Sequence, residues 1–274
     1  MHRSGTSALA GLTTLLGATP PATLLKPARD NPRGFWESRE VMTVLESLFE
    51  ASGHRWFNCF TFAADRLPAE VQAGIGQRLA AVLDTEFGDA AFFVLKDPRL
   101  CLSVDFWLPL LPATPRVLLM LRHPGEVVGS LEVRERFAPS VSAALWLHYM
   151  LEAEHRTRAM RRGFVAYDAL LKDWRRALAR ASAAAGIVWP RAPAEVSAQE
   201  AELIDPGLRH HAVAAHAMPA VPAPLDRWIA RSWTLLSDVA ELGPDPEWLE
   251  ELDQIRAEFG ACRSFIGVGG SAGG

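Results

Sequence analysis

The 274-residue sequence predicts an α/β fold with a central, mostly parallel sheet that is flanked by helices. Two short apolar runs, residues 91–95 and 116–121, both end in charge and proline, which is typical of strands buried on both faces. Helical patterns fill much of the remaining chain. Strands that alternate with helices pair in parallel, and such sheets gather their ligands at the carboxyl ends of the strands.

The remaining elements follow from hydrophobic periodicity. A third strand is expected at residues 163–166, directly before Tyr167 and Asp168. The alanine- and proline-rich stretch 190–224 is expected to be irregular, and the glycine-rich tail 267–274 to be disordered. We therefore expect a single domain over residues 1–266. Apolar residues that recur on one face predict helices at residues 38–50, 69–83, 140–160, 225–242 and 245–259.

Composition and charge exclude several classes of protein. A formal net charge of −4 gives no general attraction to nucleic acid or to anionic membranes. Cys59, Cys101 and Cys262 are too few and too widely spaced for a disulfide framework or a zinc site, and they fit a reducing cytoplasm. No apolar run reaches the roughly 18 residues of a membrane helix. We expect a cytoplasmic protein with no metal site, no nucleic-acid partner and no membrane span.

The first motif lies at residues 3–7, "RSGTS". Gly5 allows a tight turn, and Thr6 and Ser7 supply hydroxyls where a helix starting near Ala8 points free N–H groups forward. Such an arrangement binds a phosphate through backbone amides and the helix dipole. The alternative is a capped surface helix. The motif lacks the lysine and the spaced glycine of the nucleoside-triphosphatase loop.

The second motif, "LMLRHPGEVVGSLEVR", places Arg122 at the end of a strand and Ser130 eight residues later on a helix. Pro124 suits the first position of that helix. A guanidinium and a hydroxyl in these positions can converge on one phosphate, with the arginine offering a bidentate fork. The alternative is an arginine that caps the strand and a serine that faces solvent.

Four blocks, "HRSGTSAL", "LKDPRL", "LRHPGEVVGSL" and "FVAYDALLKDW", occur in this order across residues 2–174. Together they resemble sulfotransferases that use 3′-phosphoadenylyl sulfate (PAPS), in particular the bacterial branch and the related tyrosylprotein enzymes. The resemblance implies a three-layer P-loop-like fold and PAPS as the sulfuryl donor. It also implies a hydroxylated acceptor: a glycan, a small metabolite or a peptide. The acceptor's identity and the oligomeric state are not predicted.

The resemblance assigns the donor-binding residues. The loop matches the segment that grips the 5′-phosphosulfate, through Arg3, Ser4, Gly5, Thr6 and Ser7. Arg122 and Ser130 match the pair that holds the 3′-phosphate. Tyr167 matches an aromatic position near the adenine, and its alternative is a half-buried core tyrosine.

The resemblance also assigns catalytic roles to Glu37, Lys96 and Arg3. "NPRGFWES" places Glu37 as the general base that takes the proton of the attacking hydroxyl. The alternative for Glu37 is a carboxylate at a helix N-terminus, where the dipole favours it. Lys96 matches the lysine that stabilises charge on the transferring group, and a lysine at the end of a buried strand is costly unless an anion lies beside it.

Other polar residues receive weaker interpretations. Asp97 and Arg99 are expected to pair with each other rather than to orient the acceptor. His210 and His211, with Arg209, either form a lid over the nucleotide or are exposed loop residues, so the role of residues 190–224 stays open.

Relatives of this type usually carry an apolar strand directly before "HRSGTS", so the first strand of the sheet is expected to be missing from this sequence. Two functions compete with sulfotransfer. One is a truncated, non-catalytic relative that binds nucleotide. The other is a P-loop kinase, which the ending of the loop disfavours.

Overall fold

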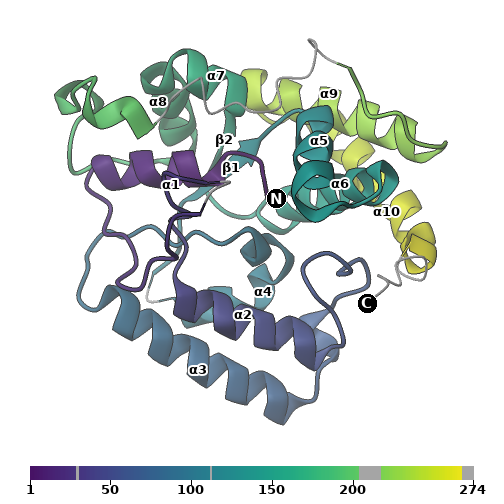
Figure 1. Ribbon diagram of the computed structural model, residues 1–274, viewed down its shortest axis with the longest axis horizontal. Helices are drawn as coiled ribbons and strands as arrows, with labels where there is room; N and C mark the ends of the chain where they lie inside the picture. Colours follow the sequence, from purple (N-terminus) through teal and green to yellow (C-terminus); the bar gives the residue numbers. More distant parts are fainter. Residues whose placement is uncertain (29–30, 112, 204–216, 267–274) are drawn as a thin grey trace.

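The computed structural model describes residues 1–28, 31–111, 113–203 and 217–266, and shows a mixed α/β fold rich in helices (Figure 1). Its centre is a two-stranded parallel sheet of β1 (Val117–Leu121) and β2 (Arg162–Ala166). Val117 lies opposite Arg162, and Leu121 lies opposite Ala166. Both strands fall where strands are predicted, at residues 116–121 and 163–166, with starts shifted by one residue.

Both faces of this sheet are covered. On β1, Leu119 and Leu121 enter one hydrophobic core, and Met120 between them enters a second. On β2, Phe164 and Val165 divide in the same way. Successive side chains of a strand point to opposite faces, so each strand contributes to two cores. The prediction of a strand buried on both faces is confirmed for β1, and β2 is buried in the same way.

Different helices build the two cores. The smaller core combines the sheet with α1 (Thr6–Leu15), α7 (Tyr167–Lys172) and α8 (Trp174–Ala185). The larger core takes in the other long helices, which Figure 1 shows as a group around α6 and as the α2–α3 pair. These are α2 (Arg39–Ala51), α3 (Ala69–Phe87), α5 (Pro124–Glu135), α6 (Pro139–Arg156), α9 (Leu225–Leu242) and α10 (Pro246–Ile266).

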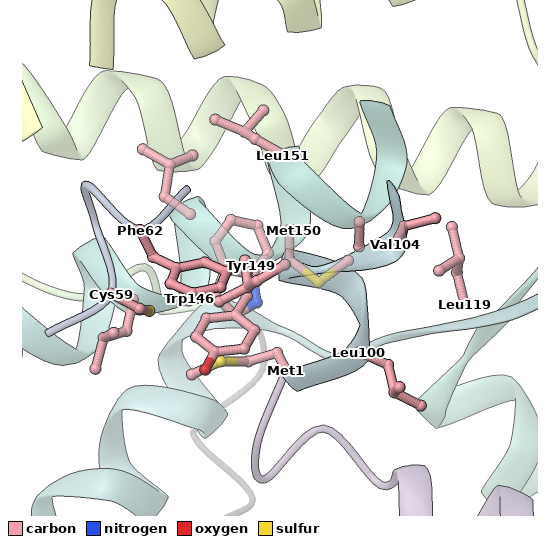
Figure 2. Close-up of a cluster of buried hydrophobic side chains, with 14 of the residues drawn as sticks. Met1, Cys59, Phe62, Leu100, Val104, Leu119, Trp146, Tyr149, Met150 and Leu151 are labelled. Carbon is pink, nitrogen blue, oxygen red and sulfur yellow. The ribbon is translucent and has the colours of Figure 1, made fainter. Parts of the chain in front are cut away.

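Trp146 and Tyr149 of α6 are fully buried in the larger core, beside Met1 and Met150 (Figure 2). Buried aromatic groups with polar atoms need hydrogen-bond partners. The Trp146 indole N–H donates to the carbonyl of Arg122 at 3.0 Å, and the Tyr149 hydroxyl donates to the carbonyl of Trp56 at 2.8 Å. The core therefore fixes the backbone at the point where β1 ends.

All five helices predicted from periodicity are present, and four of them have shifted ends. Only the helix at residues 225–242 has the predicted bounds. Ser38 caps α2, accepting from the Val41 amide at 3.0 Å, so α2 begins one residue later than predicted. Short helices complete the described chain: η1 (Ala64–Arg66), η2 (Pro98–Leu102), α4 (Val104–Trp107), η3 (Leu108–Leu110), η4 (Pro193–Glu195) and η5 (Glu200–Leu203).

The prediction of a strand at residues 91–95 is wrong. This segment forms only an isolated parallel bridge, between Phe93 and Thr19, and its first two residues are bends. Its other side borders an apolar cavity of about 380 Å³, which residues 91–98 and 113–120 line in unbroken succession. Because alternate side chains point to opposite faces, unbroken lining means that the cavity faces the backbone edges of this segment and of β1. No neighbouring strand therefore pairs with that edge of the segment.

Some predictions fall outside the described residues. Arg209, His210 and His211 lie there, as does the tail 267–274. The described part of 190–224 holds η4 and η5 before α9 begins and is otherwise irregular, as predicted. The single domain over residues 1–266 stays a prediction. In the described chain no helix combines the length and the apolar character needed to cross a bilayer.

The packing of α8 on β2 requires a glycine at residue 163, because an added Cβ there would lie 2.0 Å from the Ala181 carbonyl oxygen. We expect Gly163→Ala to lower the free energy of unfolding by about 1–3 kcal/mol or more, as overpacking does. Gly129→Ala on α5 is the matched control, because its Cβ would meet nothing within 4 Å. It should leave stability unchanged or raise it by about 1 kcal/mol through helix propensity. Equal urea midpoints for the two variants would contradict the packing.

Candidate functional site

A cavity of about 140 Å³ lies where β1, β2 and the segment 91–95 end. Arg122 follows β1, Tyr167 follows β2 and Lys96 follows the segment, and all three line the cavity. Residues 31–37 and the amino-terminal loop close it from the other side. The carboxyl ends of parallel strands are the expected ligand site of such a sheet.

The loop at residues 3–7 leads directly into α1. Gly5 has φ 87° and Arg3 has φ 62°, so both adopt left-handed backbone conformations. The helix begins at Thr6, two residues before the predicted start, and no side chain caps its first amides. Its first turn contains no acidic residue. Uncapped first-turn amides with the positive end of the helix dipole form an anion-binding site.

Tyr167 packs directly on this loop. A Cβ added to Gly5 would lie 2.4 Å from the tyrosine ring, so only glycine permits the contact. The guanidinium of Arg122 lies 4.5 Å from the centre of the same ring. Tyr167 is buried at the edge of the cavity, between the loop and the arginine. Tyr167 is thus both a core residue and a lining residue of the cavity, and its contact with an adenine stays a prediction.

Arg122 and Ser130 meet through Arg3. The guanidinium of Arg3 donates to the Ser130 hydroxyl at 2.8 Å, and Arg122 donates to the Arg3 carbonyl at 2.8 Å. Arg122 also pairs with Glu126 at 2.8 Å, one turn along α5. Ser130 itself is buried behind Arg3 and is not among the residues that line the cavity. Arg122 and Ser130 thus lie on the same side of the site. Arg122 lines the cavity itself, whereas Ser130 is separated from it by Arg3.

On the other side of the cavity, Lys96 contacts several of the residues around it. Its ammonium forms an ion pair with the Glu37 carboxylate, and it donates to the Phe35 carbonyl at 3.0 Å and to the Ser7 hydroxyl at 3.4 Å. The Ser7 hydroxyl donates to the same carbonyl at 3.1 Å. The side chains of Lys96 and Glu37 are only 10% and 8% exposed. The anion that the lysine needs is thus supplied by Glu37.

A second charged layer lies behind Glu37. Arg99 pairs with Asp97 at 3.0 Å and with Glu46 at 3.2 Å, and it lies 4.0 Å from Glu37. The expectation that Asp97 and Arg99 pair with each other is confirmed. Burial raises the pKa of Asp97 to about 6, because the charged carboxylate loses its hydration; Arg99 opposes this shift and nearby Glu37 adds to it.

Other predicted and unpredicted residues complete the site. Thr6 lines the cavity, whereas the Ser4 hydroxyl is buried and has no hydrogen-bond partner among the described residues. Sequence reasoning missed Glu126, although its spacing of four from Arg122 on a helix was a usable signal. It also missed Arg33 and Arg134, which line the cavity mouth. Nothing in the local sequence marks these two arginines.

The residues fit the phosphate groups of a nucleotide better than a whole nucleotide. Uncapped amides and the cations Arg3, Lys96 and Arg122 surround a volume below the roughly 300–1,000 Å³ of usual ligand pockets. A nucleoside would therefore extend beyond the cavity. In the described residues no cluster of His, Cys, Asp and Glu could hold a metal ion.

No protein-family model, curated protein or solved structure matches the chain. The functional interpretation therefore depends on the residues of the site.

The buried Lys96–Glu37 pair makes a prediction about stability. Lys96→Met leaves the Glu37 carboxylate without its nearest cation, so the free energy of unfolding should fall by about 3–5 kcal/mol. Adding Glu37→Gln to that variant removes the unpaired charge and should restore most of the lost free energy of unfolding. A double-mutant cycle in urea measures the coupling. Strictly additive losses would show that the two side chains act independently.

Proposed function

We propose that this protein is a sulfotransferase that moves a sulfuryl group from PAPS to a hydroxyl. One observation carries the proposal: Arg3, Lys96 and Arg122, from three separate segments, meet around an uncapped helix N-terminus with one carboxylate, Glu37, beside them. A cluster of cations and backbone amides binds a polyanion. A buried carboxylate at the same place can accept a proton.

The donor would bind along this cluster. The first amides of α1, with the Thr6 and Ser7 hydroxyls, would hold the 5′-phosphosulfate. Arg122 would hold the 3′-phosphate with Ser130, which Arg3 links to the cavity. Tyr167 lies between the two positions and would support the adenosine, consistent with its place at the edge of the cavity.

Catalysis would use the pair on the opposite wall. The acceptor hydroxyl attacks the sulfur while Glu37 takes its proton, and the bond between sulfur and the bridging phosphate oxygen breaks to release 3′,5′-bisphosphoadenosine. Lys96 and Arg3 would stabilise the charge that grows on the leaving phosphate. For this, Lys96 must break its ion pair with Glu37 and contact the donor instead. The Glu37 carboxylate is then available to act as a base.

The proposal includes the three-layer P-loop-like fold. Helices cover both faces of β1 and β2, and the loop that leads into α1 lies at the carboxyl ends of both strands. It also includes a cytoplasmic location, since Cys59, Cys101 and Cys262 are all free thiols. The acceptor is a hydroxylated glycan, small metabolite or peptide.

Donor binding is tested with 3′,5′-bisphosphoadenosine by calorimetry. We expect Arg122→Gln to weaken binding by about 10- to 100-fold, the worth of charge-assisted hydrogen bonds. Arg116→Gln, at the exposed opposite end of β1, is the control and should bind as the unchanged protein does. Tighter binding of ATP, or no effect of Arg122→Gln, would contradict the proposal; the first result would favour a kinase.

The base assignment is tested by turnover. With PAPS and an acceptor that the protein sulfates, Glu37→Gln should lower kcat by about 10²- to 10⁴-fold, because the amide cannot take a proton. Affinity for the bisphosphate should not fall, because Glu37 faces the acceptor and its carboxylate no longer competes with the donor for Lys96. Glu46→Gln is the control, a half-exposed carboxylate that contacts Arg99 outside the cavity. Full turnover by Glu37→Gln would show that another group is the base.

A further inference from the structure

Trp36 has an unusual backbone conformation. Its φ of 58° lies in the left-handed region, where a bulky residue is a strained outlier. Among described residues other than glycine, only Arg3, Trp36 and Arg136 have positive φ, and the first two line the same cavity. Such strain persists where the surrounding structure imposes it, and it gathers at functional sites.

Contacts on both sides of Trp36 impose the conformation. The Phe35 carbonyl before it accepts from Lys96 at 3.0 Å, and the Glu37 carboxylate after it pairs with the same ammonium. Asn31 ties down the start of the turn by donating to the Gly34 carbonyl at 2.7 Å. The backbone on either side of Trp36 is therefore held toward Lys96.

The core does not require a tryptophan at this position. Phe35 and Trp36 are half-buried, line the cavity, and are not among the described side chains that pack on either hydrophobic core. Glycine would take the same φ without strain. The large aromatic ring of Trp36 is held in a strained backbone conformation next to Glu37, the proposed base. This combination indicates contact with a ligand.

Phe35 and Trp36 form an aromatic wall of the cavity, and two arginines lie at its rim. Arg33 is exposed at the cavity mouth, and among the described residues no carboxylate pairs with it. The Arg134 guanidinium lies 5.8 Å from the centre of the Phe35 ring, and it also pairs with Glu135 at 3.2 Å. Both arginines add to Arg3, Lys96 and Arg122, which the donor would occupy.

We propose that Phe35 and Trp36, with Arg33 and Arg134 at the rim, bind the acceptor, and that the acceptor is a hydroxylated ring bearing a carboxylate. The ring lies on the aromatic wall with its hydroxyl toward Glu37, and its carboxylate meets Arg33. This inference rests on the proposed function, since it identifies the acceptor of the same reaction. A sugar acid and a phenolic acid share this chemistry.

Two matched pairs of probes test the inference by calorimetry, with and without saturating 3′,5′-bisphosphoadenosine. One pair is 4-nitrophenyl β-glucuronide and the corresponding glucoside; the other is 4-hydroxyphenylacetate and its amide. At least one anionic probe should bind about tenfold more tightly than its neutral partner, the effect of one charge-assisted hydrogen bond. Which pair shows the preference identifies the source as sugar or phenol.

Three variants locate the effect. Arg33→Gln should abolish the preference for the anionic probe, whereas Arg78→Gln, an exposed arginine on α3, should keep it. Trp36→Gly should weaken the anionic and neutral probes together by about tenfold, with no loss in melting temperature because the strain is relieved. Their affinity for the bisphosphate should stay unchanged.

Failure of this inference differs from failure of the proposed function. If the bisphosphate binds but anionic and neutral probes bind equally or not at all, the acceptor proposal is overturned and donor binding stands. Unchanged probe affinity in Trp36→Gly also overturns it. If the anionic probes bind as expected and the bisphosphate does not, ligand binding by Phe35 and Trp36 is supported and the proposal of sulfotransfer from PAPS is contradicted.

Discussion

The site depends on the contacts of one buried cation, the ammonium of Lys96. It joins three parts of the chain: the end of the segment 91–95, the first turn of α1 through Ser7, and the turn before α2 through Phe35 and Glu37. A buried ammonium is stable only when anions and carbonyl oxygens replace its hydration. The position of Glu37 and the backbone conformation of Trp36 both follow from that requirement.

The sheet explains why these groups meet. Parallel strands end at one edge, so Arg122 after β1 and Tyr167 after β2 reach the same place as Lys96. Trp146 holds the Arg122 carbonyl from the core, and Glu126 holds its guanidinium from α5. The positive groups are thus positioned by rigid elements, and an arriving anion would find them already oriented.

The sequence predicted the parts of the structure that depend on local pattern. Local patterns located β1 and β2, periodicity located five of the long helices, and the motifs placed Arg122 and the loop at one cavity, with Ser130 behind Arg3. The segment at Phe93 was wrongly predicted as a strand, because strand pairing needs neighbours that a local run does not specify. The contact of Tyr167 with Gly5 and the strain at Trp36 arise from tertiary packing, so no local signal shows them.

The most direct test of the central claim is a crystal structure of the protein with 3′,5′-bisphosphoadenosine. Our account expects the 5′-phosphate at the first amides of α1 and within hydrogen-bond reach of Lys96, the 3′-phosphate at Arg122, and Glu37 released from Lys96. A bisphosphate bound elsewhere, or one bound here with the Lys96–Glu37 pair intact and Arg122 not in contact with phosphate, would contradict the account.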